Sequence, residues 1–120
     1  MRDTNPVVGT LLAFITFAIA NGASAAGVDA NAAQMLARQS GCLKCHAVDK
    51  QKDGPAYREV AAKYRGQADA ATKLVHHITS GEKVKFADGH TEDHAIVKSK
   101  VAADIRNLVD WILSLDGATP

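Results

Sequence analysis

Aromatic side chains are scarce in this sequence, at 5% of 120 residues, and it contains only two cysteines. A domain of this size buries only a marginal core by itself. No second cysteine pair is available to complete a four-ligand structural zinc site. A formal net charge of +1 without a polybasic run excludes electrostatic binding to nucleic acid or an anionic membrane. No segment alternates like a β-strand of useful length, so the sequence predicts a small all-α protein.

The N-terminal segment is typical of a secretory signal peptide. A short head carries Arg2, an apolar stretch runs from Val7 to Ala20, and the small residues Ala23-Ser24-Ala25 follow. The apolar stretch, about 14 residues, is shorter than a membrane-spanning helix requires. We expect residues 1–25 to be a signal peptide and residues 26–120 to form one domain in the periplasm. The alternative is a membrane anchor that is not cleaved.

The segment Cys42-Leu43-Lys44-Cys45-His46 is a C-x-x-C-H motif, the attachment pattern of a c-type haem. Two thiols on one tight turn can add across the two vinyl groups of haem, and the adjacent imidazole then lies under the iron. A redox disulfide of thioredoxin type is the alternative, but it requires a βαβ setting that the chain lacks. We therefore expect one haem c, bound covalently through Cys42 and Cys45, to supply the core that the aromatic-poor chain lacks.

The remaining sequence predicts four helices connected by polar turns. Apolar residues at helical spacing, with capping residues before them and glycines after them, predict helices over Ala30–Gln39, Pro55–Tyr64, Asp69–Ser80 and Ser99–Leu115. The segment Gly81–Lys98 is polar and aperiodic, and an irregular segment of this length is usually functional. We expect it to cover the open face of the haem.

Three stretches resemble the small bacterial monohaem class I cytochromes c. The segments Gly41–Asp49 and Gly54–Ala68 carry most of the likeness, and Trp111-Ile112-Leu113-Ser114 continues it more loosely. The resemblance implies the cytochrome c fold, with four helices around one haem and the first and last helices packed together. It also implies that the protein is an electron carrier and not an enzyme.

By this resemblance, Cys42 and Cys45 form the thioether bonds and His46 binds the iron. Pro55 lies where the family places a proline whose carbonyl accepts a hydrogen bond from that imidazole, which fixes its tautomer. In the family a methionine from the loop before the last helix is the second axial ligand. Here the only methionines are Met1 and Met35, both before the motif, and Met35 is expected in the core.

Histidines are therefore the candidates for the sixth iron ligand. His94 and His90 lie in the loop where the methionine is expected, and we prefer His94 because Glu92 and Asp93 precede it and a helix follows. An empty or water-bound sixth position is the third alternative. His76 and His77 are expected to point sideways or outward from their helix, as exposed histidines. Phe86, the aromatic of the loop, is expected to contact the haem.

The predicted function is periplasmic electron transfer through one haem of lower reduction potential than in the methionine-ligated relatives, because a second imidazole favours ferric iron. Its partners would be redox proteins that dock transiently. An alternative is binding or sensing of a small ligand such as nitric oxide or carbon monoxide at a displaceable sixth position. A further alternative is the haem subunit of an oxidoreductase complex.

Overall fold

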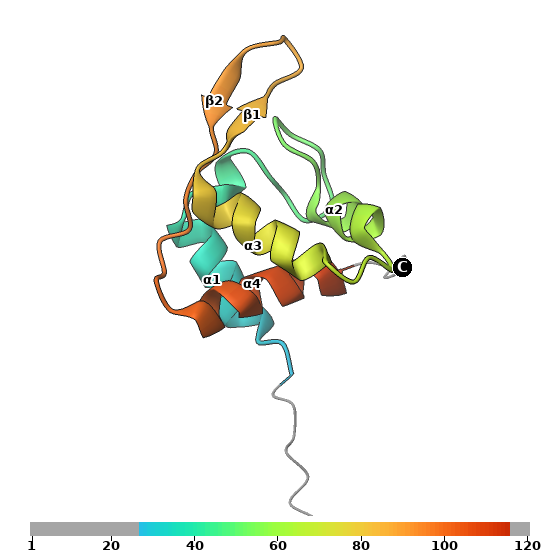
Figure 1. The fold of residues 1–120 in the computed structure, drawn as a ribbon, viewed down its shortest axis with the longest axis vertical. Helices are drawn as coiled ribbons and strands as arrows, with labels where there is room; N and C mark the ends of the chain where they lie inside the picture. The colour runs from blue at the N-terminus through green and yellow to red at the C-terminus, as the bar shows by residue number, and fades with distance from the viewer. Residues whose placement is uncertain (1–26, 116–120) are drawn as a thin grey trace, which may run out of the picture.

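The computed structural model describes residues 27–115, and the signal peptide expected over residues 1–25 lies outside them. Four α-helices confirm the predicted helical class (Figure 1). Their bounds, with those of a short 3₁₀ helix η1 and two strands, are α1 Ala30–Gln39, η1 Cys42–Lys44, α2 Tyr57–Tyr64, α3 Ala70–Ser80, β1 Lys83–Lys85, β2 Thr91–Asp93 and α4 Ala102–Ser114. Within the described residues, no helix is long and apolar enough to span a membrane.

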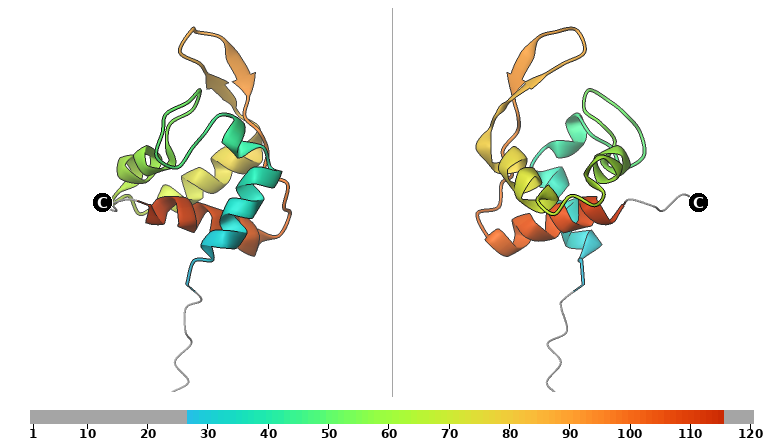
Figure 2. Two further views of the ribbon diagram at one scale, coloured as in Figure 1. Left: turned by 180° about the vertical axis from the view of Figure 1, so that it is seen from behind. Right: turned by 45° about the vertical axis from the view of Figure 1, so that its right-hand side comes forward.

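Helices α1 and α4 cross and form the centre of the core, as both views in Figure 2 show. Ala37 on α1 and Val109 on α4 are 0% exposed. Their small side chains let the two backbones approach closely, and the larger Leu108 and Trp111 fill the space beside them. The predicted packing of the first helix against the last is therefore confirmed.

A polar connection also joins these two helices. The Asp29 carboxylate caps α1 by accepting a hydrogen bond from the Ala32 amide at 3.0 Å. The Asp29 backbone exchanges two hydrogen bonds with the Asn107 side chain on α4, each 2.9 Å long. Asp29 thus provides a hydrogen-bond acceptor for the first turn of α1 and connects that turn to α4.

Met35 lies on α1 at the surface, near Asp104 and Asn107 of α4. Its side chain is 56% exposed, so the expectation that it belongs to the core is wrong. The physical reason is helical phase, because Ala33, Leu36 and Ala37 occupy the face toward α4 and Met35 falls outside it.

The loop between α3 and α4 contains an antiparallel β-hairpin, contrary to the expectation of no strand. Val84 pairs with Glu92, and the hairpin projects away from the helices (Figure 1). Gly89 at its turn has a φ of 93°, a conformation that favours glycine. The strands escaped sequence prediction because each has three residues and neither has a buried face.

Helix α2 begins at Tyr57, two residues later than expected. Ala56, with φ −60° and ψ 146°, is extended, and the Pro55 carbonyl before it accepts a hydrogen bond from His46. Helix α4 begins at Ala102 and not at Ser99, whose hydroxyl accepts a hydrogen bond from the Val101 amide and donates one to Asp104. Both shifts follow from side-chain and carbonyl contacts that compete with the first helical turn.

Candidate functional site

The C-x-x-C-H motif forms one tight turn at the end of α1. Gly41 ends the helix with a φ of 76°, in the left-handed region, and η1 begins directly after it. The His46 amide donates to the Cys42 carbonyl at 3.0 Å, which closes the turn. Cys42 and Cys45 are free, half-buried thiols on this turn. The turn therefore presents both sulfurs and the imidazole to the same side of the molecule.

The His46 ring is held on two sides. Its Nδ1 donates a hydrogen bond of 2.7 Å to the Pro55 carbonyl, as the resemblance predicts, so Nε2 is left free to bind a metal. The Tyr57 ring stacks on the imidazole with centroids 5.3 Å apart. A Cβ at Gly54 would lie 2.6 Å from His46 Cε1, so only glycine fits beside the ring.

A cavity of about 1120 Å³ opens beside this ring. It is lined by both cysteines of the motif and by residues from α2, α3, the hairpin and α4. Leu108, Val109 and Ile112 form part of its apolar wall. The volume exceeds the range of about 300–1,000 Å³ typical of small-molecule sites, so there is room for a large flat group.

His94 faces this cavity from the segment between β2 and α4. Its ring centroid lies 6.2 Å from that of His46. His94 Nδ1 donates to the Ala95 carbonyl at 2.9 Å, which leaves Nε2 free, as in His46. Burial lowers the pKa of His94, and the nearby charge of His77 lowers it further. The neutral imidazole, the form that binds metals, is therefore favoured.

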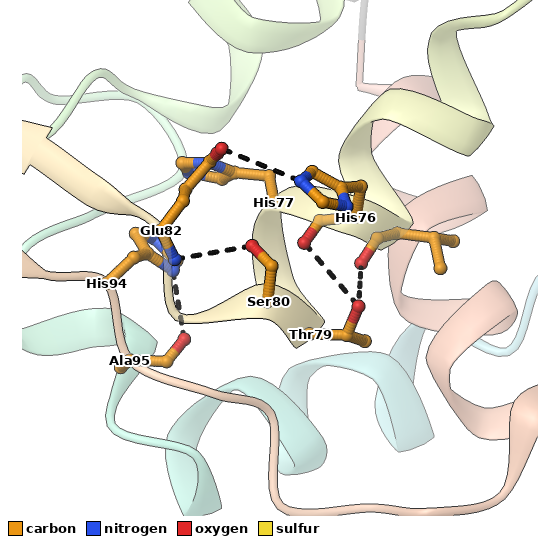
Figure 3. A network of polar contacts seen from close by, with 8 residues as sticks. His76, His77, Thr79, Ser80, Glu82, His94 and Ala95 are labelled. Atoms are coloured by element: carbon orange, nitrogen blue, oxygen red, sulfur yellow. Dashed lines mark hydrogen bonds and ion pairs between the residues drawn. The ribbon is translucent and has the colours of Figure 1, made fainter.

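His77 also lines the cavity and is half-buried, so it points sideways from α3 and is less exposed than expected. Its ring lies beside that of His94, with centroids 4.0 Å apart (Figure 3). Its Nδ1 forms a hydrogen bond with the Glu82 carboxylate. The neighbouring His76 also borders the cavity, but its side chain is 70% exposed, as expected, against 33% for His77. Helical phase could have revealed the difference, because His77 shares the face of the buried Leu74 and Ile78.

His90 lies away from this group, near the hairpin turn. It is exposed, and its ring forms hydrogen bonds with the carboxylates of Asp88 and Glu92. It does not belong to the lining of the cavity in the described part of the chain. Phe86 does line the cavity and stacks on His90, with centroids 4.4 Å apart. Of the two histidines predicted as alternatives, the structure brings only His94 to the side of His46.

Tyr57 is a site residue that the sequence analysis did not identify. Its hydroxyl forms a hydrogen bond with the Cys42 thiol. Burial raises the pKa of both groups, and for Cys42 it outweighs the hydrogen bond from Tyr57, which lowers that pKa. The Tyr57 ring also meets Trp111 edge to face at 5.7 Å. This contact connects the wall of the site to α4 and the core.

Charged residues of both signs surround the cavity. Its lining includes four lysines and six carboxylates, namely Lys44, Lys63, Lys73, Lys85, Asp53, Glu59, Asp69, Glu82, Glu92 and Asp93. Lys73 pairs with Asp69 at 3.0 Å. Because charges of both signs are mixed here, this surface should attract neither an acidic nor a basic partner strongly. The distribution is that of an ordinary solvent-exposed surface.

The helical fold and this site are those of a cytochrome c. The chain belongs to the cytochrome c family, because the family model "Cytochrome c" matches residues 30–116. It is 44% identical over 81 residues to cytochrome c-551 of Allochromatium vinosum, covering 68% of this chain and 83% of the relative. It is 33% identical over 90 residues to cytochrome c-551 of Pseudomonas aeruginosa, covering 75% and 83%.

Solved structures agree with this assignment. The class 1 cytochrome MtoD of Sideroxydans lithotrophicus ES-1 shares 61% identity, with a TM-score of 0.71 over 74% of this chain and 98% of that one. Cytochrome c552 of Nitrosomonas europaea shares 35% identity, with a TM-score of 0.53 over 68% and 98%. The chain is therefore an electron carrier of a family whose members hold one covalently bound haem c, and the predicted cytochrome c fold is confirmed.

The residues present fit such a group. The two cysteine sulfurs lie at one wall of the cavity and apolar residues at another. The absence of a side chain at Gly54 leaves room for the His46 ring. The centroids of the His46 and His94 rings lie 6.2 Å apart, and each ring uses Nδ1 for a hydrogen bond to a backbone carbonyl, which leaves Nε2 free. Haem bound here would cover apolar surface that is otherwise open to water.

Proposed function

We propose that this protein is a periplasmic electron carrier whose haem iron is held between His46 and His94. The observation that carries the proposal is the separation of 6.2 Å between the centroids of these two rings. A metal–nitrogen bond to imidazole is about 2.0–2.1 Å long. The nitrogen lies roughly 1.1 Å from the centre of a five-membered ring with ordinary C–N bond lengths. Two imidazoles on opposite sides of one metal should therefore have centroids about 6.3 Å apart.

The hydrogen bonds of the two rings support the same assignment. Each Nδ1 donates to a backbone carbonyl, Pro55 for His46 and Ala95 for His94. Such partners fix the tautomer with the metal-binding lone pair on Nε2 and raise the basicity of the ligand. Cys42 and Cys45 hold the cofactor covalently, and Phe86 contributes to the wall near the hairpin.

The sixth ligand sets the direction of the reduction potential. No methionine follows Met35 in the sequence, and Met35 lies outside the cavity lining, so within residues 27–115 no methionine thioether is positioned for the iron. Methionine–histidine ligation raises the potential of cytochromes c. A second imidazole is a harder donor that favours ferric iron, so this carrier should have a lower potential than methionine-ligated relatives.

When bound, haem supplies one reversible electron between its ferric and ferrous states. The protein's part would be to keep Nε2 of His46 and of His94 in place and to exclude water from the apolar wall at Leu108 and Ile112. Partners would be periplasmic redox proteins that dock transiently through small interfaces. The N-terminal segment, read as a signal peptide, supports the periplasmic location.

Spectroelectrochemical titration of the holoprotein tests this function, with Allochromatium vinosum cytochrome c-551 measured in the same buffer. We expect a reversible one-electron couple at a lower potential than that of the relative. His90→Ala should leave the couple unchanged, because His90 lies outside the cavity. A potential equal to or above that of the relative would contradict two-imidazole ligation. Fast binding of carbon monoxide to the reduced protein would instead support a small-ligand sensor.

A further inference from the structure

We propose that His77 is a reserve axial ligand, able to bind the iron when His94 is lost or displaced. This inference rests on the proposed function, since it takes His94 as the resident ligand. Its basis is a pair of histidines that line one cavity side by side, with ring centroids only 4.0 Å apart. Moving the His77 ring by that distance would bring it to the position that His94 now occupies.

His77 is prepared for this role by its hydrogen bond. Its Nδ1 contacts the Glu82 carboxylate, which leaves Nε2 free. The bond matches the carboxylate–histidine–metal arrangement, in which the second nitrogen of a ligating histidine donates to an oxygen. His46, His94 and His77 thus each have an oxygen partner at Nδ1, whereas His76 lies 3.8 Å from Glu82 through its Nε2 and is largely exposed.

His77 lies on a helix, whereas His94 lies on a segment without regular secondary structure. His77 lies on α3, one turn from its C-terminal end, and its neighbours Leu74 and Ile78 are buried in the core. His94 lies between β2 and α4, where residues 94–101 form neither helix nor strand. Its amide donates a hydrogen bond of 2.9 Å to the Glu82 carbonyl, which joins that segment to the residue whose carboxylate also holds His77.

A reserve ligand changes what loss of His94 would do. Without one, the iron would become five-coordinate or water-bound, and the protein would bind small ligands readily. With His77 available, the iron keeps two imidazoles, and the protein remains a closed electron carrier when the His94 segment moves.

Low-temperature electron paramagnetic resonance and near-infrared magnetic circular dichroism of ferric holoproteins test the proposal. The set comprises the unmodified protein, His94→Ala, His77→Ala, the His77→Ala/His94→Ala double variant and the control His76→Ala. We expect low-spin, two-imidazole spectra from all single variants, with shifted g values in His94→Ala only. The double variant should be high-spin.

The outcomes separate this proposal from the proposed function. A high-spin His94→Ala protein would overturn the reserve role of His77 and leave His94 as the ligand. A high-spin His77→Ala protein with His94→Ala unchanged would make His77 the resident ligand and overturn both proposals. A double variant that stays low-spin would show that a group other than His77 replaces His94, and would overturn the reserve role alone. Far-ultraviolet circular dichroism of each holoprotein identifies any variant that fails to fold, and in that case His94→Gln and His77→Gln replace the alanines.

Discussion

The Gly54→Ala substitution should destabilise the holoprotein through the His46 ring. The added Cβ would lie 2.6 Å from Cε1 and 2.9 Å from Nδ1 of that imidazole. Carbon atoms make optimal contact at about 3.5–4.0 Å, so the ring would have to move by roughly 1 Å. Such a movement stretches the 2.7 Å hydrogen bond to Pro55 and presses the ring toward Tyr57, which stacks on its face.

Overpacking of this kind costs typically about 1–3 kcal/mol. In a domain of this size, each kcal/mol lowers the melting temperature by about 4–8 °C, so we expect a decrease of about 5–20 °C. The matched control is Gly27→Ala, because nothing lies within 4 Å of a Cβ there and neither glycine has a positive φ. Thermal unfolding of both ferric holoproteins, followed by far-ultraviolet circular dichroism, makes the measurement. Equal melting temperatures for the two variants would refute the tight fit at His46.

Three further predictions concern the frame around the site. Asp29→Ala should lower the free energy of unfolding in urea by about 0.5–2 kcal/mol through loss of the α1 cap, and Asp29→Asn, which can still cap, should lose less. Hydrogen bonding to Asp88, and secondarily to Glu92, raises the pKa of His90 above 6.5, so Asp88→Asn should lower that pKa in an NMR titration; an unchanged value would contradict the pairing. Because the pKa of His90 is raised, its ion pairs with Asp88 and Glu92 are fully present below about pH 6.5. They are lost as the pH rises through the pKa of His90. Expression without haem attachment should give a chain with weaker helical circular dichroism and a lower melting temperature, because the cavity of about 1120 Å³ is left unfilled; an apoprotein as stable as the holoprotein would contradict this account.

Local signals made most of the frame predictable. Asp29 before α1 and Gly81 after α3 mark helix ends that the structure confirms. The C-x-x-C-H motif is contiguous, so its turn could be inferred from sequence alone. The hairpin was missed because its strands are short, exposed and charged, and they lack the apolar alternation that reveals a strand.

The far side of the cavity could be predicted only in part. His90 and His94 lie four residues apart in the sequence, and the hairpin decides between them by carrying His90 toward its turn. The spacing of His77 from the buried Leu74 and Ile78 could have indicated its partial burial, but its contacts with Glu82 and His94 could not be predicted, because both partners come from outside its helix. These contacts depend on how α3 and the hairpin meet, which no local pattern specifies.

Iron K-edge X-ray absorption of the ferric holoprotein tests the central proposal most directly, because it reports the atoms bound to the metal. The account predicts six nitrogen neighbours at about 2 Å and no sulfur, four from the porphyrin and one each from His46 and His94. A sulfur neighbour near about 2.3 Å, or a shell of only five neighbours, would contradict it.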